Sequence, residues 1–298
     1  MQLRSIPIDQ NRMETTLHGA PGFPLAVYHS VMSGNVLGYI NWHWHEEMQF
    51  CRVTRGAVRI FVNEKQYLLR EGEGIFINSG YLHMTRPEGD PDSAYICLDA
   101  APRLLAGFAG SAMEEKYLQP YLRDPALADL VLRPEVPWQA QVLEGVRTIY
   151  ELSEENDFGY ELETCALLNR MWLTLLRNRP AQAGRPRTRY ESNAAVQGML
   201  TYIGQHYAER LTVEDIARSV SFSAAECCRM FKRVTGETIF TYLKNYRLAR
   251  GRTLLRETDL PVSRIAYEVG FCSTSYFIEV FKASFAMTPL QYRKGGGA

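Results

Sequence analysis

The sequence has no net charge, no long apolar run and no paired cysteine motif. Its 298 residues contain 33 Lys and Arg against 33 Asp and Glu. No stretch supplies the roughly 18 apolar residues that a membrane helix needs, because Arg170 interrupts the best candidate at residues 165–176. The six cysteines form no C-x-x-C pair, and residues 1–10 lack the apolar core of a signal peptide. We therefore expect a protein of the reducing cytoplasm with no membrane partner.

The balance of charges conceals a difference between the two ends of the chain. Residues 188–298 contain 15 Lys and Arg against 10 Asp and Glu, which gives this segment a charge of +5. The remainder has 18 basic residues (33 − 15) against 23 acidic ones (33 − 10), or −5. A basic segment joined to an acidic one favours a nucleic-acid-binding domain attached to a domain of another kind.

Two kinds of sequence pattern divide the chain. Up to about residue 95, short alternating segments separated by turn residues indicate strands of a β-barrel or sandwich; examples are residues 48–54, 58–63 and 74–78. From residue 101, apolar residues recur at helical spacing, most clearly in residues 136–152 and 160–177. Two prolines, a glycine and four arginines in residues 178–189 indicate an exposed linker.

These patterns predict an α+β protein of two domains. The predicted parts are a β-barrel over residues 1–100, a helical region over 101–177, a linker over 178–192 and an all-α domain over 193–298. Two long helices that follow a barrel can pack on it or on a second subunit.

The last part of the chain carries one pattern twice. The first copy is Leu211-Thr212-Val213-x-x-Ile216-Ala217-x-x-Val220-x-Phe222, and 49 residues later (260 − 211) the second is Leu260-Pro261-Val262-x-x-Ile265-Ala266-x-x-Val269-x-Phe271. Each copy runs on to a Phe-Lys pair, at 231–232 and 281–282. A repeat of this period implies two copies of one supersecondary unit. Each copy has the pattern of helix, short turn and helix, the arrangement that places its second helix in the DNA major groove.

Local signals indicate where these helices begin and end. Thr212 with Asp215, and Ser223 with Glu226, have the spacing of capping boxes, and Gly236 has the position of a helix stop. The outward positions of the second helices are then the predicted DNA contacts: Ala224, Ala225, Cys228, Arg229, Lys232 and Arg233 in the first copy, and Thr274, Ser275, Glu279 and Lys282 in the second.

Arg229 is the strongest predicted base contact, because its planar guanidinium can bond O6 and N7 of guanine together. Glu279 occupies the same position in the second copy, at an offset of 50. A glutamate can accept from cytosine N4 but is repelled by phosphate. The two copies are therefore expected to recognise different sequences about one helical turn apart, roughly 34 Å.

Residues 193–294 resemble the DNA-binding domain of the AraC/XylS family of bacterial transcription regulators. The motifs that match are Ile216-Ala217, Phe231-Lys232-Arg233-x-Thr235-Gly236, Tyr246-Arg247-Leu248, Leu254-Leu255, Ile265-Ala266-x-x-Val269-Gly270-Phe271, Ser275-Tyr276-Phe277, Phe281-Lys282 and Thr288-Pro289-x-x-Tyr292-Arg293. Gly251 replaces a usual Ala, Ala286 a usual Gly, and Glu279 a common basic residue. The resemblance implies a nucleoid-associated bacterial activator that binds double-stranded promoter DNA, contacts RNA polymerase and forms homodimers through the helical region.

The N-terminal part holds a candidate polar pocket. His43 and His45 alternate on a predicted strand, so both imidazoles face one side, and Gln49 shares their parity. Residues 38–56 and 72–83 resemble the two motifs of the cupin superfamily. In metal-binding cupins three histidines and one glutamate hold the ion. His43, His45 and His83 match them, and Gln49 replaces the carboxylate.

A neutral amide is a poorer metal ligand than a carboxylate and does not balance a divalent cation. The favoured interpretation is therefore an effector pocket without a cofactor, lined by His43, His45, Gln49, Tyr81 and His83. One alternative is a divalent metal at His43, His45, Gln49 and His83, and another is a set of hydrogen-bonded core residues.

The resulting hypothesis is a sequence-specific DNA-binding transcriptional regulator, not an enzyme, that responds to a small-molecule effector in a cupin-like barrel. The alternative function is a cupin metalloenzyme, such as a dioxygenase or isomerase, fused to a DNA-binding domain.

Overall fold

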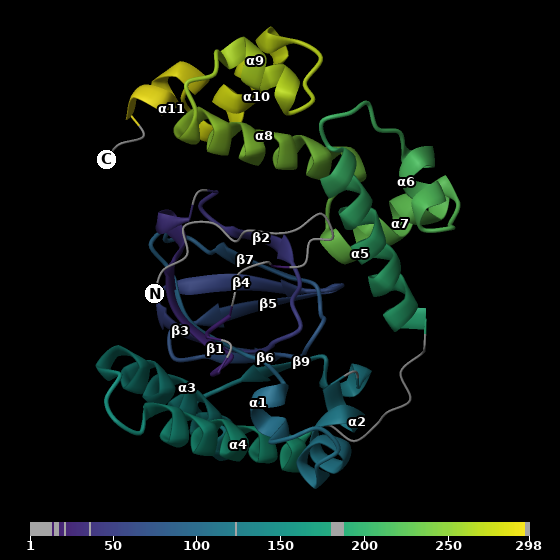
Figure 1. Ribbon diagram of the computed structural model, residues 1–298. Helices are drawn as coiled ribbons and strands as arrows, with labels where there is room; N and C mark the ends of the chain where they lie inside the picture. The colour runs from purple at the N-terminus through teal and green to yellow at the C-terminus, as the bar shows by residue number, and fades with distance from the viewer. Residues whose placement is uncertain are drawn as a thin grey trace. The chain divides into compact units, whose positions relative to one another are not determined.

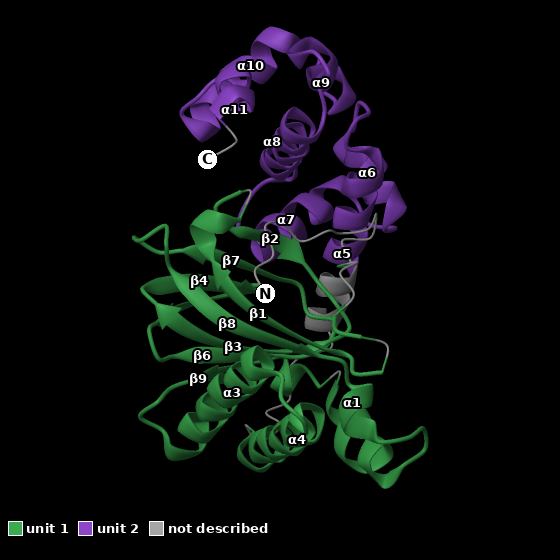
Figure 2. Ribbon diagram, turned by 60° about the vertical axis from the view of Figure 1, so that its left-hand side comes forward, with its two compact units in different colours: residues 1–9, 13–193 green, residues 10–12, 194–298 purple. Residues whose placement is uncertain are grey.

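The structure, a computed structural model, describes residue 14 and residues 18–20, 22–35, 37–122, 124–179 and 188–295. Beyond the first twelve residues the chain divides into two compact units, unit 1 at residues 13–193 and unit 2 at residues 194–298 (Figure 2). Most of the predicted linker falls at residues 180–187, outside the described residues.

Unit 1 contains two antiparallel sheets (Figure 1). The first has the order β1 (Leu25–Val31), β8 (Ala94–Ala100), β3 (Met48–Arg55), β6 (Gly74–Ile77) and β9 (Asp129–Leu132). The second has the order β2 (Ile40–His43), β7 (His83–Pro87), β4 (Ala57–Val62) and β5 (Lys65–Arg70). The predicted N-terminal β domain is confirmed, and its described strands pair as two sheets rather than as one closed hydrogen-bonded barrel.

The first sheet is covered on both faces. Along β8, Ile96 and Leu98 belong to a core shared with the helices, whereas Tyr95 and Cys97 belong to a core shared with the second sheet. Successive side chains of a strand point to opposite faces, so every residue of β8 is buried. Strand β4 alternates between buried and half-buried residues, as expected for a strand with one covered face.

Two long helices cover the first sheet: α3 (Pro137–Glu155) and α4 (Tyr160–Asn178) (Figure 1). Pro137 occupies the first turn of α3, where its missing N–H costs no hydrogen bond. The shorter helical segments of unit 1 are η1 (Met32–Gly34), α1 (Arg103–Ala106), the π-helical turn η2 (Met113–Leu118), α2 (Gln119–Leu122) and η3 (Pro125–Leu127).

Unit 2 is built of helices alone in its described residues. They are α5 (Thr188–His206), α6 (Val213–Ser219), α7 (Ala224–Thr235), α8 (Ile239–Glu257), α9 (Val262–Glu268), α10 (Thr274–Phe285) and α11 (Pro289–Gly295). The α6–α7 and α9–α10 pairs are the two predicted helix-turn-helix units, called the first and second reading units below. Helix α8 connects them, so the predicted all-α domain is confirmed.

The duplication extends into the core of unit 2. Phe231 of α7 packs against Tyr242 of α8, with ring centroids 5.5 Å apart. Fifty residues later, Phe281 of α10 packs against Tyr292 of α11 at 5.8 Å. Each reading unit is thus fixed by the helix that follows it, through the same aromatic contact.

One arginine of α8 and one of α11 bond the chain segment that leads into the corresponding reading unit. Arg247 of α8 donates to the carbonyl oxygens of Tyr207 and Glu209, both at 2.7 Å. Arg293 of α11 donates at 2.6 Å to the carbonyl oxygen of Leu260, which precedes α9. These bonds satisfy carbonyl groups near helix ends that have no partner within the helix.

Gly251 lies where α8 meets α10. A Cβ atom at this position would lie 3.0 and 3.1 Å from two ring carbons of Phe277. The glycine therefore lets α8 approach the aromatic core of the second reading unit closely. This contact explains the departure from alanine in spite of the cost of about 1 kcal/mol that glycine imposes within a helix.

Candidate functional site

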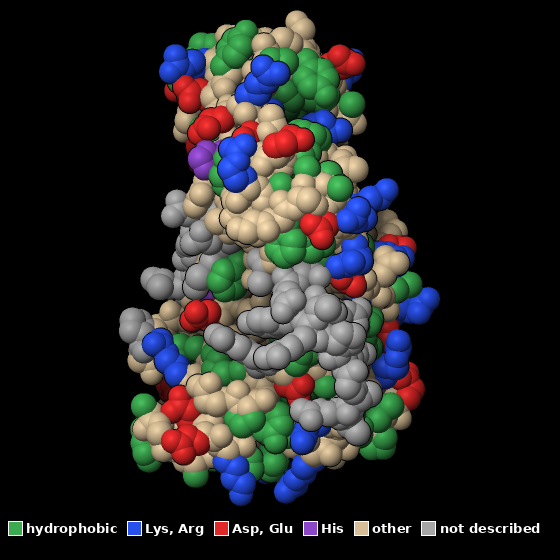
Figure 3. Space-filling view, turned by 90° about the vertical axis from the view of Figure 1, so that its right-hand side faces the viewer, with side chains coloured by type: hydrophobic (Ala, Val, Ile, Leu, Met, Phe, Trp, Pro, Cys, Tyr) green, Lys and Arg blue, Asp and Glu red, His purple; other side chains and the backbone are tan. Residues whose placement is uncertain are grey.

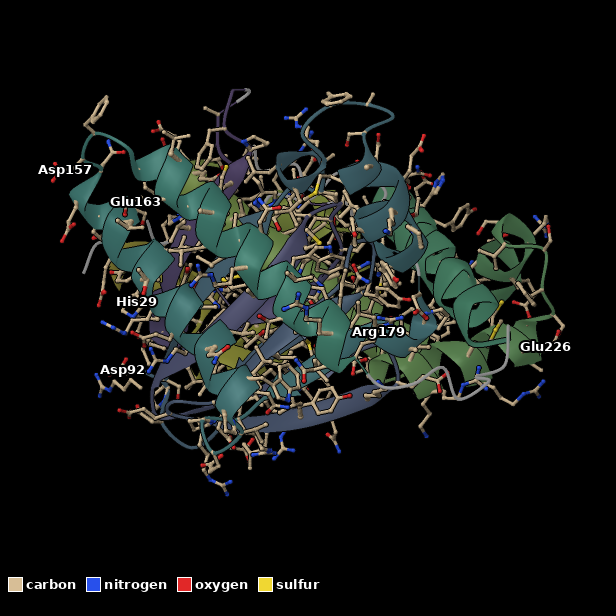
Figure 4. All side chains as sticks on the ribbon, turned by 90° about the horizontal axis from the view of Figure 1, so that it is seen from below. His29, Asp92, Asp157, Glu163, Arg179 and Glu226 are labelled. Atoms are coloured by element: carbon tan, nitrogen blue, oxygen red, sulfur yellow. The ribbon has the colours of Figure 1, made fainter. Side chains whose placement is uncertain are left out.

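Helix α7 of the first reading unit is capped at both ends by residues adjacent to it in the sequence. The capping box of Ser223 and Glu226 is present, as is that of Thr212 and Asp215 on α6, and Gly236 ends α7 with a φ of 76°. Glu226 is labelled in Figure 4. These predicted caps are confirmed, and they hold the first turn of α7 without help from distant residues.

The predicted contact residues of α7 lie on its outer face. Cys227, Met230 and Phe231 are buried against the rest of unit 2. The exposed residues are Ala225, Cys228, Arg229, Lys232 and Arg233, and Ala224 is half-buried. The structure therefore places all six on one accessible side, as a DNA-contacting helix requires.

Helix α10 of the second reading unit has a different outer face. Ser275, Glu279 and Lys282 are exposed and Thr274 is half-buried. Tyr276 and Ile278 are also exposed, by 46% and 36%. We did not predict Tyr276 as a contact, because it stands within a motif that defines the fold; its position next to Ser275 at the start of α10 was the available signal.

The two faces differ in charge. Helix α7 carries three basic residues and one acidic residue, for a net charge of 3 − 1 = +2, whereas α10 carries one of each and has no net charge. On the face drawn in Figure 3, Lys and Arg side chains alternate with Asp and Glu side chains. Of the two helices, α7 therefore has the charge better suited to phosphate contacts.

The second candidate site is a buried histidine cluster in unit 1. His43 ends β2 and His83 begins β7, and the two residues are direct cross-strand partners. His45 lies in the next turn, where its carbonyl oxygen accepts from Gly80 N–H at 2.9 Å. One ligand atom from each histidine lies within 4.8 Å of those of the others. The structure thus brings together the three histidines that the sequence singled out.

Backbone carbonyls fix the orientation of all three imidazoles. Each Nδ1 faces a carbonyl oxygen: His43 that of Asn41 at 2.8 Å, His83 that of Tyr81 at 2.8 Å, and His45 that of Glu47 at 3.2 Å. A carbonyl oxygen can only accept, so each Nδ1 carries the proton. The Nε2 atom of a neutral ring is then left with a lone pair.

Burial also sets the charge of these rings. It lowers the pKa of His45 and His83 well below the usual value, and the neighbouring histidines lower both further. Both side chains are accordingly neutral near pH 7. His45 and His83 therefore present nitrogen lone pairs rather than positive charge.

Acidic side chains surround the histidines. A carboxylate oxygen of Glu14 lies 3.7 Å from His43 Nε2, and one of Asp99 lies 3.9 Å from His45 Nε2. His18 lies between them, 3.6 Å from Glu14 and 3.5 Å from Asp99. Burial acts to lower the pKa of His18, but the hydrogen bond with Glu14 and the nearby carboxylates raise it to about 9. Burial raises the pKa of Asp99 to about 7.

The remaining predicted pocket residues are also buried nearby. Gln49 of β3 pairs with Asp99 of β8 across the sheet, and its side chain hydrogen-bonds that carboxyl group. Tyr81 orients His83 through its carbonyl oxygen, while its ring lies in the core between the sheets.

Glu14, His18 and Asp99 were not predicted from the sequence. The spacing of Glu14 and His18 carries no periodic signal, and their nearness to β2 depends on contacts between distant segments. Asp99 could have been found from its strand, because it has the same parity as Tyr95 and Cys97 of the inter-sheet core.

A β domain with a buried polar cluster, joined to a domain with two reading helices, defines the class of DNA-binding regulators that carry a ligand-binding domain. Residues 35–136 match the family described as the AraC-like ligand binding domain, and residues 216–295 match a helix-turn-helix domain family. An uncharacterised helix-turn-helix transcriptional regulator of Bacillus subtilis is 36% identical over 292 residues, which cover 98% of this chain and 99% of the relative. The chain belongs to the AraC family of DNA-binding transcriptional regulators.

Other relatives match parts of the chain. The transcriptional activator RhaS of Enterobacter is 33% identical over 152 residues, or 51% of this chain and 53% of its own length. A solved AraC-type DNA-binding domain from Chromobacterium violaceum is 27% identical and aligns with 36% of this chain and 96% of its own, with a TM-score of 0.35. Within the described residues, no helix has both the length and the apolar character needed to cross a membrane.

Proposed function

We propose that this regulator binds an asymmetric promoter site through α7 and α10, and that a small-molecule effector bound in unit 1 controls this binding. The observation that carries the proposal is the pair of reading units with equivalent aromatic packing and two different outer faces. Such a chain can contact two unlike half-sites in successive major grooves without first forming a dimer.

Within this proposal each outer residue has a role set by its position. Arg229, one and a half turns into α7, contacts a guanine edge, while Lys232 and Arg233 in its last turn contact phosphates. Ala224, Ala225 and Cys228 lie against the groove floor. On α10, Thr274, Ser275 and Glu279 contact bases, and Lys282 contacts phosphate. The capped first turn of α7 supports tighter binding by the first reading unit.

The effector site is proposed at the buried cluster of His43, His45, Gln49, Tyr81 and His83. Its polar atoms are enclosed within a rigid pair of sheets, which is typical of a small-molecule site. The chain acts by binding rather than by catalysis, in line with relatives that are regulators.

Helices α3 and α4 are the proposed homodimer region. Three apolar residues are exposed there: Phe158 in the connecting loop, and Leu162 and Leu173 of α4. Apolar residues on an outer face are typical of a surface that a partner covers. On promoter DNA in the bacterial cytoplasm, the dimer is proposed to act as an activator that contacts RNA polymerase.

Selection of bound duplexes from a random pool by the full-length protein tests the DNA-binding proposal. We expect an enriched site with two unlike halves about one helical turn apart. A palindromic site, or no enrichment, would contradict it.

A thermal-shift screen with small metabolites tests the effector proposal separately. A ligand at 100 times its dissociation constant stabilises the protein by about 2.7 kcal/mol. The shift should disappear in His45→Ala and persist in His206→Ala, which removes a histidine of unit 2. A shift that survives His45→Ala would place the effector elsewhere.

A further inference from the structure

Unit 2 contains a groove with a volume of about 630 Å³. Its walls come from residues 208–211, which lead into α6, from the first half of α8, and from residues 267–276, which span the end of α9 and the start of α10. The groove therefore lies between segments of the two reading units. Its volume falls within the range of about 300–1,000 Å³ that is typical of small-molecule sites.

Contacts within unit 2 hold these walls in place. Gly270, in the turn between α9 and α10, has a φ of 87°, and a Cβ atom there would lie 2.6 Å from the carbonyl oxygen of Tyr207 and 2.8 Å from that of Ala208. Glycine thus lets the turn pack directly on the segment before α6. Arg247 binds the same segment through two backbone carbonyl oxygens. The groove is consequently formed by the protein itself, as ligand sites usually are.

Large aromatic side chains line this groove. Phe240, Tyr267 and Tyr276 are 52%, 58% and 46% exposed. Leu243 and Phe271, which also line it, are buried. Exposed aromatic residues grouped around an apolar surface are typical of a site that a flat apolar group covers.

The charged residues of the groove are mostly basic. There are three cations, Arg210, Lys244 and Arg247, and one acidic residue, Glu209, which gives a net charge of 3 − 1 = +2. The Glu209 carboxylate lies 3.2 Å from Nδ1 of His206, which does not line the groove. Within the described part of unit 2, none of the three cations forms an ion pair. The groove thus has an excess of positive charge that an anion would complement.

Arg247 shows why this excess favours a bound anion. It is half-buried, and burial lowers the pKa of its guanidinium. Its hydrogen bonds go to neutral carbonyl groups, which do not cancel its charge. A half-buried charge without a counter-ion is unfavourable, so a bound carboxylate would stabilise this one. Lys244 is three residues earlier in α8 and therefore lies on the same side of the helix.

We infer that this groove binds a small organic anion with a flat apolar ring system. The aromatic residues contact the rings, and Lys244 and Arg247 contact the anionic group. The DNA backbone is a poorer match, because a sugar-phosphate chain supplies charge but little apolar surface for three aromatic residues to cover. Tyr276 follows Ser275 at the start of α10, so the bound anion lies beside the proposed DNA contacts. Binding in this groove depends neither on those contacts nor on the effector site proposed in unit 1.

Calorimetric titration of the full-length protein with 2-naphthoate tests the inference. This probe carries one carboxylate on a flat apolar ring system. We expect one site per chain that persists in His45→Ala, because that variant alters unit 1 only. Binding of 2-naphthamide, which has the same rings and no charge, should be about fivefold weaker. Loss of all binding in His45→Ala would place the probe in unit 1 and overturn the inference.

Two substitutions test the contacts themselves. Lys244→Gln removes a charge and keeps a long polar side chain, and it should weaken 2-naphthoate binding about fivefold. Phe240→Ala should weaken it about threefold. Lys294→Gln in α11 and Phe108→Ala in unit 1 change exposed residues outside the groove, so they are matched controls that should leave the affinity unchanged. Circular dichroism confirms that each variant is folded. Equal affinities of Lys244→Gln and Lys294→Gln would overturn the inference.

Two cysteines allow a test in the wild-type chain. Cys272 lines the groove, Cys228 lies on the outer face of α7, and both are exposed. Exposed thiols react with N-ethylmaleimide, and mass spectrometry of the peptides measures each rate. At ten times its dissociation constant, 2-naphthoate leaves about one groove in eleven empty, so it should slow labelling of Cys272 about tenfold and leave that of Cys228 unchanged.

Two results of the labelling would contradict the inference. The first is an unchanged rate at Cys272, or equal slowing at both cysteines. The second is protection of Cys272 by duplex DNA but not by 2-naphthoate, which would assign the groove to the DNA backbone.

Discussion

The two reading units share one frame and differ in their surfaces. Both pack an aromatic residue of the second helix on a tyrosine of the following helix, and both are tied by an arginine to the segment that enters them. Helix α7, however, has a capping box and a net charge of +2, whereas α10 has a single serine cap and no net charge. The shared contacts preserve the fold, and under the proposed function the outer positions set the sequence preference.

The largest effect is expected at Arg229. Replacing it with alanine removes the arginine of α7 that is proposed to bond a base edge with two hydrogens. Loss of a bidentate contact should cost about 1–3 kcal/mol, or roughly 5- to 150-fold in affinity, and relax the preference at one base pair. Fluorescence anisotropy on matched and single-substituted duplexes measures both quantities. Arg147→Ala, which removes an exposed arginine of α3, is the control. Unchanged selectivity would remove Arg229 from the contact set.

Gly251→Ala tests the close contact of α8 with the second reading unit. Its methyl group would crowd Phe277, and overpacking of this kind costs about 1–3 kcal/mol, against a gain of about 1 kcal/mol in helix propensity. We expect a net loss of about 1 kcal/mol in urea denaturation. Phe277→Leu in the same chain should reduce the penalty, since it removes the ring that is crowded. An increase in stability would show that Phe277 moves aside freely.

The residues that end α7 and α10 have the same backbone conformation but differ in residue type. Gly236 and Ala286 both adopt positive φ, at 76° and 57°, and only the second carries a side chain there. Left-handed backbone costs a non-glycine residue about 1 kcal/mol. Ala286→Gly should therefore raise the free energy of unfolding by about that amount, and Gly236→Ala should lower it equally. Thermal unfolding of both variants compares them, and a change of the same sign in the two would contradict the comparison.

The smallest effect is expected at Glu279. In the proposed complex the Glu279 carboxylate is also repelled by nearby DNA phosphates, so Glu279→Gln should strengthen binding by about 0.2–1 kcal/mol, roughly 1.4- to 5-fold. The gain should shrink as salt is raised, because salt screens the repulsion that is removed. Affinities at two salt concentrations measure this dependence. A loss of affinity would contradict this expectation and show that the hydrogen bond that Glu279 accepts from a base outweighs the repulsion by phosphates.

Features set by neighbours in the chain were predictable from the sequence. The capping boxes at Thr212 and Ser223, the stop at Gly236 and the buried positions of α7 follow from spacing within a few residues. His43 and His45 were predicted to alternate on one strand, but β2 ends at His43, so the nearness of His45 depends on the turn that follows. The role of Gly251 was not predictable, since it depends on Phe277 of another helix.

The surroundings of the histidine cluster were likewise not predictable from the sequence. Gln49 suggested a site without a carboxylate, whereas the fold brings Glu14 and Asp99 within 4 Å of the imidazoles. These contacts join segments that are far apart in the sequence, so no local sequence pattern predicts them. The division of the strands between two sheets also depends on long-range pairing.

Base-by-base substitution of the bound DNA site, measured with the wild type, Arg229→Ala and Glu279→Gln, tests the central claim most directly. If the two reading units contact different half-sites, Arg229→Ala should flatten the preference at one position only. Glu279→Gln should then act at a different position about one helical turn away, on the order of 10 base pairs. Changes at the same position, or a profile that is symmetric about its centre, would contradict the account.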